Sequence, residues 1–190
     1  TIAVRDAAGD LAPTITTQPV SQTVDEGTPL TFAVTVSSGT APVAYQWRKG
    51  TTAISGATDA TLAFAEALSG GSYSVIVTNY LGTATSLAAT LTINPSTPPV
   101  ITQQPQSATV LAGQPASFTV ASTGSPPRYQ WLRNGSAVGG ATNATLTIAA
   151  VTLADAGSYT VQLTNRAGNV TSLAAVLTVN APPVIMAQPS

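Results

Sequence analysis

Residues 156–165 read "AGSYTVQLTN", and residues 71–79 read "GSYSVIVTN", which is nearly the same sequence. In both stretches apolar side chains occupy every second position. They are Tyr73, Val75 and Val77 in the first stretch and Tyr159, Val161 and Leu163 in the second. A period of two places such side chains on one face of a β-strand, with Ser and Thr on the other face. We therefore expect one long, half-buried strand in each half of the chain.

The rest of the chain repeats as well. "YQW" occurs at 45–47 and at 129–131, and "TSLAATLTIN" at 85–94 returns as "TSLAAVLTVN" at 171–180. The offset is 84 residues between the tryptophans, Trp47 and Trp131, and 86 residues in the later segments. The length differences fall between the predicted strands, where surface loops tolerate them. The repeat therefore indicates two copies of one domain.

We expect these copies at 13–95 and 96–181. The segment 1–12 is interpreted as a trailing strand or linker from a preceding repeat. "PPVIMAQPS" at 182–190 matches "PPVITQQPQ" at 98–106, so it is interpreted as the start of a further repeat. The boundary is rich in proline, which lacks a backbone donor and cannot continue a sheet ladder.

Strand and turn signals alternate along both copies. The last strand of each copy is expected to place four alternate side chains on its core face. They are Leu87, Ala89, Leu91 and Ile93 in the first copy and Leu173, Ala175, Leu177 and Val179 in the second. In the preceding hairpins, "NYLG" and "NRAG", Gly82 and Gly168 are expected in the left-handed conformation. Short strands at this spacing predict an all-β sandwich or barrel.

Three motifs in combination resemble a known family. "YQW", "DAGSY" ahead of the penultimate strand, and the following Asn-x-x-Gly look like an immunoglobulin-like domain of the I-set type. More narrowly, the chain is similar to cysteine-free bacterial versions found in tandem in large secreted and surface proteins. The resemblance implies two tandem immunoglobulin-like β-sandwiches with Greek-key topology and no disulfides.

The resemblance also assigns structural core residues. Trp47 and Trp131 match the tryptophan that packs between the sheets, and Tyr73 and Tyr159 match the tyrosine corner. The cysteine positions hold four valines, Val34 with Val75 and Val120 with Val161. Losing a disulfide costs about 2–5 kcal/mol, and a buried valine contributes about 1.5–3 kcal/mol. We therefore expect valine packing to replace the cystine. The acidic residue before the tyrosine is Asp155 in the second copy, but Ser69 in the first.

Composition limits the possible functions. The chain has no His and no Cys, so catalytic triads of the usual kind and most zinc sites are impossible. We predict no catalytic, cofactor-binding or metal-binding residues and no cofactor. A Ca²⁺ site formed by Asp25 and Glu26 together with Asp6 or Asp10 is a weaker alternative, because calcium requires six to eight oxygens. Only 7% of the residues are charged and the net charge is −1, which argues against nucleic-acid binding. No apolar run is long enough to span a membrane.

The expected function is structural. We interpret the chain as a non-enzymatic structural or adhesive segment of a bacterial surface or extracellular protein. It would act as a tandem spacer or as a fibre building block, assembled by addition of the terminal strands 1–12 or 182–190. Its partners would be neighbouring repeats or other copies. The alternative is a module that binds a surface glycan or a protein, or accessory domains of a secreted enzyme. Tyr80 and Arg166, at matching hairpin tips, are the candidate loop contacts.

Overall fold

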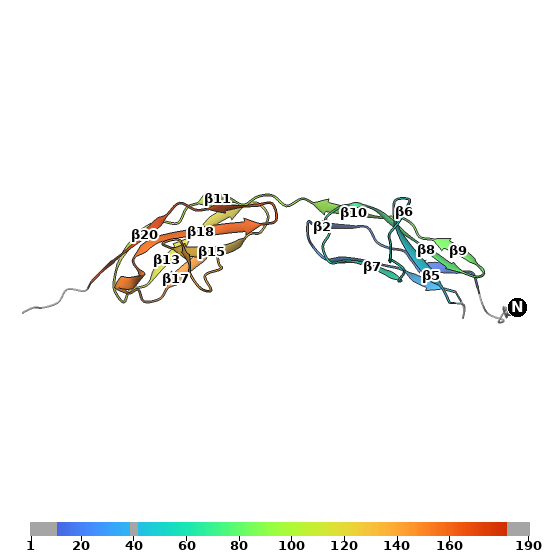
Figure 1. Ribbon diagram of the computed structural model, residues 1–190, viewed down its shortest axis with the longest axis horizontal. Helices are drawn as coiled ribbons and strands as arrows, with labels where there is room; N and C mark the ends of the chain where they lie inside the picture. The colour runs from blue at the N-terminus through green and yellow to red at the C-terminus, as the bar shows by residue number, and fades with distance from the viewer. Residues whose placement is uncertain (1–10, 39–41, 182–190) are drawn as a thin grey trace, which may run out of the picture. The chain divides into compact units, whose positions relative to one another are not determined.

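The computed structural model describes residues 11–38 and 42–181. The chain divides into two compact units, Thr1–Pro95 and Ser96–Ser190, called domain 1 and domain 2 below. Within the described residues each domain has ten strands (Figure 1). The predicted terminal segments lie outside the described residues, except for Leu11 and Ala12.

Domain 1 is a two-layered sandwich. Its strands are β1 (Thr14–Thr17), β2 (Gln22–Asp25), β3 (Leu30–Ala33), β4 (Thr35–Ser37), β5 (Ala44–Lys49), β6 (Thr52–Ala53), β7 (Thr61–Phe64), β8 (Gly71–Asn79), β9 (Gly82–Thr85) and β10 (Ala89–Asn94). One layer has the order β2-β10-β8-β5-β6, with β9 paired to β8. The other layer is made of the pairs β1–β4 and β3–β7, because β3 and β4 follow each other with only Val34 between them.

Domain 2 repeats this topology strand for strand. Its elements are β11 (Val100–Gln103), β12 (Ala108–Leu111), β13 (Ala116–Thr119), β14 (Ala121–Thr123), β15 (Arg128–Arg133), β16 (Ser136–Ala137), β17 (Thr145–Ile148), the 3₁₀ helix η1 (Leu153–Asp155), β18 (Gly157–Asn165), β19 (Gly168–Thr171) and β20 (Ala175–Asn180). The layers are β12-β20-β18-β15-β16 with β19, and the pairs β11–β14 and β13–β17.

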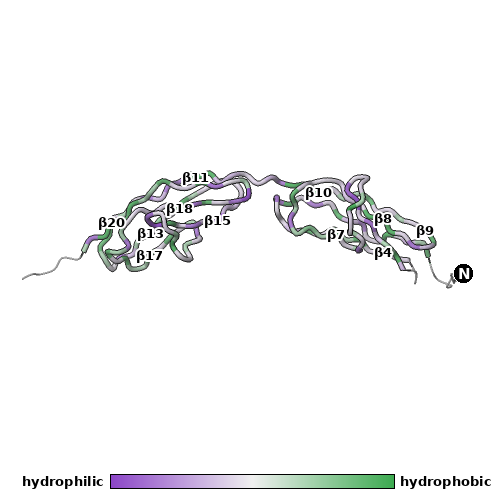
Figure 2. The backbone as a smooth tube through the Cα atoms, viewed as in Figure 1, coloured by the Kyte–Doolittle hydropathy of each residue, from purple (hydrophilic) through white to green (hydrophobic). Residues whose placement is uncertain are grey.

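The core of each domain lies between its two layers. Along the long strand β8 the residues Tyr73, Val75 and Val77 are buried, whereas the residues between them are not. Buried and exposed residues alternate in the same way along β10 and β20, and hydrophobic and hydrophilic positions are interspersed along both domains (Figure 2). This alternation is what a sheet with one solvated face requires. The predicted fold class, two tandem β-sandwiches without disulfides, is confirmed.

One prediction about the core is wrong. Leu87 and Leu173 were expected on the core face of the last strand, but each is 69% exposed. The strand begins two residues later, at Ala89 and at Ala175. Ser86 and Ser172, which precede these leucines by one residue, are buried instead. The positions whose side chains face the core therefore shift by one residue before the strand begins. A simple alternation read from the sequence cannot register this break.

The prediction for the hairpin glycines is also wrong. Gly82 has no positive φ, and Gly168 has a φ of 159°, which is far from the left-handed helical value of about 57°. The turns are stabilised by a side chain instead. The Oδ1 atom of Asn165 accepts hydrogen bonds from the backbone N–H of Ala167 and Gly168, at 2.9 and 3.2 Å. Asn79 makes the equivalent bonds in domain 1. Such an Asx turn closes the hairpin without a left-handed glycine.

Candidate functional site

The residues predicted to form the structural core are all buried between the layers. They are Val34, Trp47, Tyr73 and Val75 in domain 1 and Val120, Trp131, Tyr159 and Val161 in domain 2. In each domain the two valines and the tryptophan belong to one apolar cluster. The indole Nε1–H of Trp47 donates to the carbonyl of Asp59 at 2.9 Å, and that of Trp131 donates to the carbonyl of Asn143 at 2.9 Å. The only polar atom of each indole is therefore satisfied.

A tyrosine corner is formed in domain 2. The hydroxyl of Tyr159 donates to the backbone carbonyl of Asp155 at 2.7 Å. The carboxylate of Asp155 accepts hydrogen bonds from the N–H and the hydroxyl of Thr152, at 2.8 and 2.7 Å, and pairs with Arg133 at 3.2 Å. The bonds from Thr152, and next the charge of Arg133, hold the pKa of Asp155 below its ordinary value. This arrangement fixes the loop that leads into β18.

Domain 1 stabilises the same corner differently. Lys49 takes the place of Arg133, and Ser69 that of Asp155. The Nζ atom of Lys49 lies 2.9 Å from the Ser69 Oγ atom and 5.6 Å from the centroid of the Tyr73 ring. The ion pair of domain 2 is thus replaced by a hydrogen bond and a cation–π contact.

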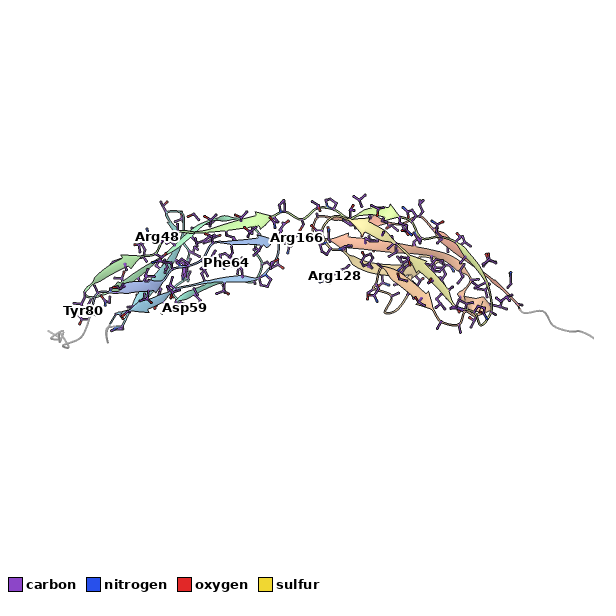
Figure 3. All side chains as sticks on the ribbon, turned by 180° about the vertical axis from the view of Figure 1, so that it is seen from behind. Arg48, Asp59, Phe64, Tyr80, Arg128 and Arg166 are labelled. Carbon is purple, nitrogen blue, oxygen red and sulfur yellow. The ribbon has the colours of Figure 1, made fainter. Side chains whose placement is uncertain are left out.

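The two predicted loop contacts lie at hairpin tips. Tyr80 is 48% exposed at the turn between β8 and β9, and Arg166 is exposed at the matching turn between β18 and β19 (Figure 3). The chemistry of the two tips differs, since one carries a phenol and the other a guanidinium. No further aromatic side chain accompanies Tyr80 in its turn, where Leu81 is the other residue. The tips therefore do not form a repeated binding surface.

Two buried serines were not predicted from the sequence. Ser86 and Ser172 are each 7% exposed. The Oγ atom of Ser172 accepts a hydrogen bond from the N–H of Val161 at 3.0 Å, and Ser86 does the same for Val75. The repeated segment "TSLAA" contains both serines, but a single serine before a strand is too common to indicate a buried hydrogen-bonding role.

The hairpin asparagines also hold the incoming chain. In domain 2 the Nδ2 atom of Asn165 donates to the carbonyls of Thr97 and Ser125, at 2.8 and 2.9 Å. The N–H of Thr97 donates to the Ser125 Oγ atom at 3.0 Å. In domain 1 the Nδ2 atom of Asn79 donates to the carbonyl of Leu11 at 2.7 Å. The residues that precede the first strand are therefore fastened to the domain that they enter.

A groove runs along one side of domain 2, between β16 and β17. It consists of two adjoining hollows of about 460 and 450 Å³, which share Val138, Leu146 and Ile148. Arg133 and Asp155 lie at the edge of the first hollow. In domain 1 the position of Ile148 is taken by Phe64, whose ring packs edge-on against Phe32 and Tyr73. Apolar and polar groups contribute comparably to the lining of the groove.

The described residues contain no cluster of three or more His, Cys, Asp or Glu side chains that could hold a metal ion. Asp25, which was considered as a calcium ligand, accepts a hydrogen bond from Asn94 at 3.0 Å. Across the same parts of the chain, no helix has the length and apolarity to cross a membrane.

Comparisons with known proteins agree with this architecture. The family model of the immunoglobulin domain matches residues 98–165. A chimeric titin Z1Z2, functionalized with a KLER exogenous peptide from decorin, is 30% identical, with coverage of 92% of this chain and 99% of that chain and a TM-score of 0.57. No curated protein matches the chain.

Two further solved structures are similar. The titin domains z1z2 in complex with telethonin are 30% identical, with coverage of 92% and 99% and a TM-score of 0.45. The N-terminal Ig1-2 module of the Drosophila receptor protein tyrosine phosphatase DLAR is 25% identical, with coverage of 88% and 98% and a TM-score of 0.42. On its sandwich topology, its buried tryptophans and its 30% identity to the titin chimera, the chain belongs to the immunoglobulin-domain family and forms two such domains in tandem.

Proposed function

We propose that the chain is a non-enzymatic, load-bearing segment that holds distance between the parts of a larger structure. The observation that carries this proposal is the pairing of the first and last strands of one layer in each domain. β2 pairs with β10 in parallel over four residues, Gln22–Asp25 with Leu91–Asn94, and β12 pairs with β20 in the same way.

Parallel pairing of these strands determines how each domain resists tension. β2 lies near the start of domain 1, and β10 lies at its end. A force applied through the two ends of the domain pulls parallel neighbours in opposite directions along their length. All hydrogen bonds between the two strands are then loaded together in shear, rather than one after another. The domain consequently resists extension until the whole ladder fails.

The attachment of the incoming chain supports the same role. Thr97 is bonded to Ser125 and Asn165, so the chain belongs to domain 2 from this residue on. β10 ends at Asn94, which leaves Pro95 and Ser96 between the last strand of one domain and the fastened chain of the next. A short connection that begins with proline has few backbone conformations. Such a connection suits a spacer better than a flexible tether.

The proposal also covers the type of immunoglobulin domain, the location of the protein and its partners. In both domains the larger layer has one additional two-residue strand, β6 beside β5 or β16 beside β15. The constant type of immunoglobulin domain lacks such strands and the variable type has two, so one short strand supports the intermediate I-set type. We also propose a location on the surface of a bacterium or outside it, with which a chain that folds without cysteine is compatible, because no oxidant is needed after export. Neighbouring repeats and proteins are the proposed partners. Titin z1z2 is described in complex with telethonin, a protein partner of that chain.

Terminal strand addition remains a prediction, because 1–10 and 182–190 lie outside the described residues. Deleting residues 182–190 is expected to abolish assembly through this segment. Assembly that is unchanged by the deletion would contradict terminal strand addition.

Single-molecule pulling of the whole chain tests the load-bearing role. We expect two separate unfolding events, each releasing about 300 Å of chain, since each domain holds about 85 residues at roughly 3.5 Å each. The N–H of Ala112 donates to the carbonyl of Asn180. By alternation the N–H of Val110 also faces β20, and that of Thr109 faces away. Val110→Pro should therefore lower the force of one event.

Two controls separate the ladder from packing and from general damage. Thr109→Pro leaves the inter-strand donors intact and should keep the force near that of the wild type. Val110→Ala removes packing but keeps the N–H, and its effect should be smaller than that of Val110→Pro. If both proline variants lower the force equally, the parallel ladder does not bear the load.

A further inference from the structure

The outer edge of β17 in domain 2 is an open strand edge. Among the described residues β17 pairs with β13 alone. The N–H of Val120 donates to the carbonyl of Ala144, so the main chain of Ala144 faces β13 and β14. In an antiparallel pair the direction of the main-chain groups alternates. Consequently Leu146 and Ile148 also face β13, and the N–H and C=O groups of Thr145 and Thr147 point to the open side.

The side chains support this assignment. Thr119 and Thr145 are opposite each other in the register, and their Oγ1 atoms are 3.0 Å apart. Such close side chains are typical of a pair that exchanges no main-chain hydrogen bonds. Thr145 and Thr147 also line the groove beside β17. An added strand requires unpaired main-chain groups with room alongside, and this edge provides both.

Domain 1 has the matching edge on β7. The N–H of Val34 donates to the carbonyl of Ala60, which directs the main-chain groups of Thr61 and Ala63 outward by the same alternation. Asp59, which precedes this strand, is exposed (Figure 3). The two edges therefore offer the same hydrogen-bonding pattern in different electrostatic surroundings.

We propose that β7 of one copy of the chain adds antiparallel to β17 of a second copy. Thr61 lies opposite Thr147 and Ala63 opposite Thr145, which forms four main-chain hydrogen bonds. This register places Asp59 just beyond Ile148, at the end of the groove that Arg133 lines. Arg133 is 39% exposed despite its ion pair with Asp155.

The net charges of the two domains favour pairing of β7 with β17 over pairing of β7 with β7 or of β17 with β17. Residues 1–95 carry six acidic and three basic residues, a net charge of −3, whereas residues 96–190 carry one acidic and three basic residues, a net charge of +2. Domain 1 of one copy is thus attracted to domain 2 of another. Because the two edges differ, the contact is heterologous, and such a contact either closes into a ring or continues from copy to copy.

The size of the contact makes the association weak and reversible. Strands of four residues bury far less than the roughly 1,600 Å² of a stable interface, so we expect a dissociation constant of about 100 μM or weaker. The inference is independent of the load-bearing role, since a chain that resists force but never associates would leave that role intact.

Sedimentation velocity on the whole chain, from about 10 μM to about 1 mM, tests the pairing. The wild type should associate increasingly with concentration, and less at high salt. Thr147→Pro and Ala63→Pro each remove an outward N–H, which an edge strand tolerates, and should weaken association at least about tenfold. Thr147→Val and Ala63→Val keep the N–H and serve as matched controls. Asp59→Arg should also weaken it.

The two indole N–H signals in NMR spectra, one from each domain, confirm that every variant is folded. A chain that stays monomeric throughout the concentration range would overturn the proposal, as would proline variants that associate like the wild type. Loss of association in Thr147→Pro but not in Ala63→Pro would mean that β17 pairs with itself, which also overturns it.

Discussion

Replacing Ser172 by alanine should destabilise domain 2 selectively. The pairing register shifts by one residue in this region, from Gln162 opposite Thr171 to Tyr159 opposite Ala175. The carbonyl that would accept a hydrogen bond from Val161 in a regular ladder is displaced by this bulge. The Oγ atom of Ser172 takes its place, at 3.0 Å from the Val161 nitrogen.

The expected magnitude follows from what the substitution leaves behind. Val161 is fully buried, so water cannot replace the lost acceptor. A buried N–H without a partner costs about 1–3 kcal/mol. Ser172 also donates to the carbonyl of Leu173 at 2.8 Å, but Leu173 is exposed and water compensates there. We therefore expect a loss of about 2 kcal/mol in the free energy of unfolding of domain 2.

Urea titration followed by NMR measures this loss in each domain separately. Trp47 and Trp131 are the only tryptophans, so each indole N–H signal reports one domain. With a denaturant slope of about 1–2 kcal/mol per molar, the midpoint of the Trp131 signal should fall by roughly 1–2 M, and that of Trp47 should not change. Ser86→Ala should give the reverse pattern. A shift of the Trp131 midpoint below about 0.3 M would refute the role assigned to the Ser172 hydroxyl.

Two further changes test the loops of domain 2. The pKa of Asp155 is lowered in the folded state, so its carboxylate stabilises the domain above its ordinary pKa of 3.8, and this contribution is lost as the pH falls through the lower folded value. Asp155→Ser introduces the residue that domain 1 has at this position. It should lower the stability of domain 2 at pH 7 and make that stability depend less on pH in acid, and thermal melts with an unchanged acid dependence would contradict this. Gly124 has a φ of 98°, and a β-carbon there would clash with the carbonyl oxygen of Pro98, so Gly124→Ala should cost at least about 1–3 kcal/mol in urea titration. Gly139→Ala, with open space around it, should cost much less.

Most of the strands could be predicted from the sequence, because side-chain alternation is a local property. Val75 and Val161 could be placed inward from their neighbours alone, and both are fully buried. The alternation misled at Leu87, because the buried positions shift by one residue between Ser86 and Ala89, while the apolar residues continue to alternate without a break. The left-handed glycines were predicted from turn composition, but Asn79 and Asn165 close the hairpins through side-chain bonds that composition does not specify.

The groove of domain 2 could not be predicted from the sequence. Phe64 and Ile148 both look like core residues at the same position of the repeat. The space left beside Ile148 depends on residues from β16, β17 and β18, whose relative placement is set by the two loops between them and by the packing of the layers. Likewise, the roles of Ser86 and Ser172 depend on a bulge that exists only once three strands have paired.

By itself, the sequence determined that the chain forms two β-domains with tryptophan-centred cores and no cysteine or histidine chemistry. Those properties follow from residue type and from a period of two, both of which act over a few residues. Only the tertiary structure decided which main-chain groups are left unpaired, as at Thr145 and Thr147, and which hydroxyls stand in for a carbonyl. Hydrogen-bond direction is set by the partner strand, and that partner is brought alongside only when the whole sandwich closes.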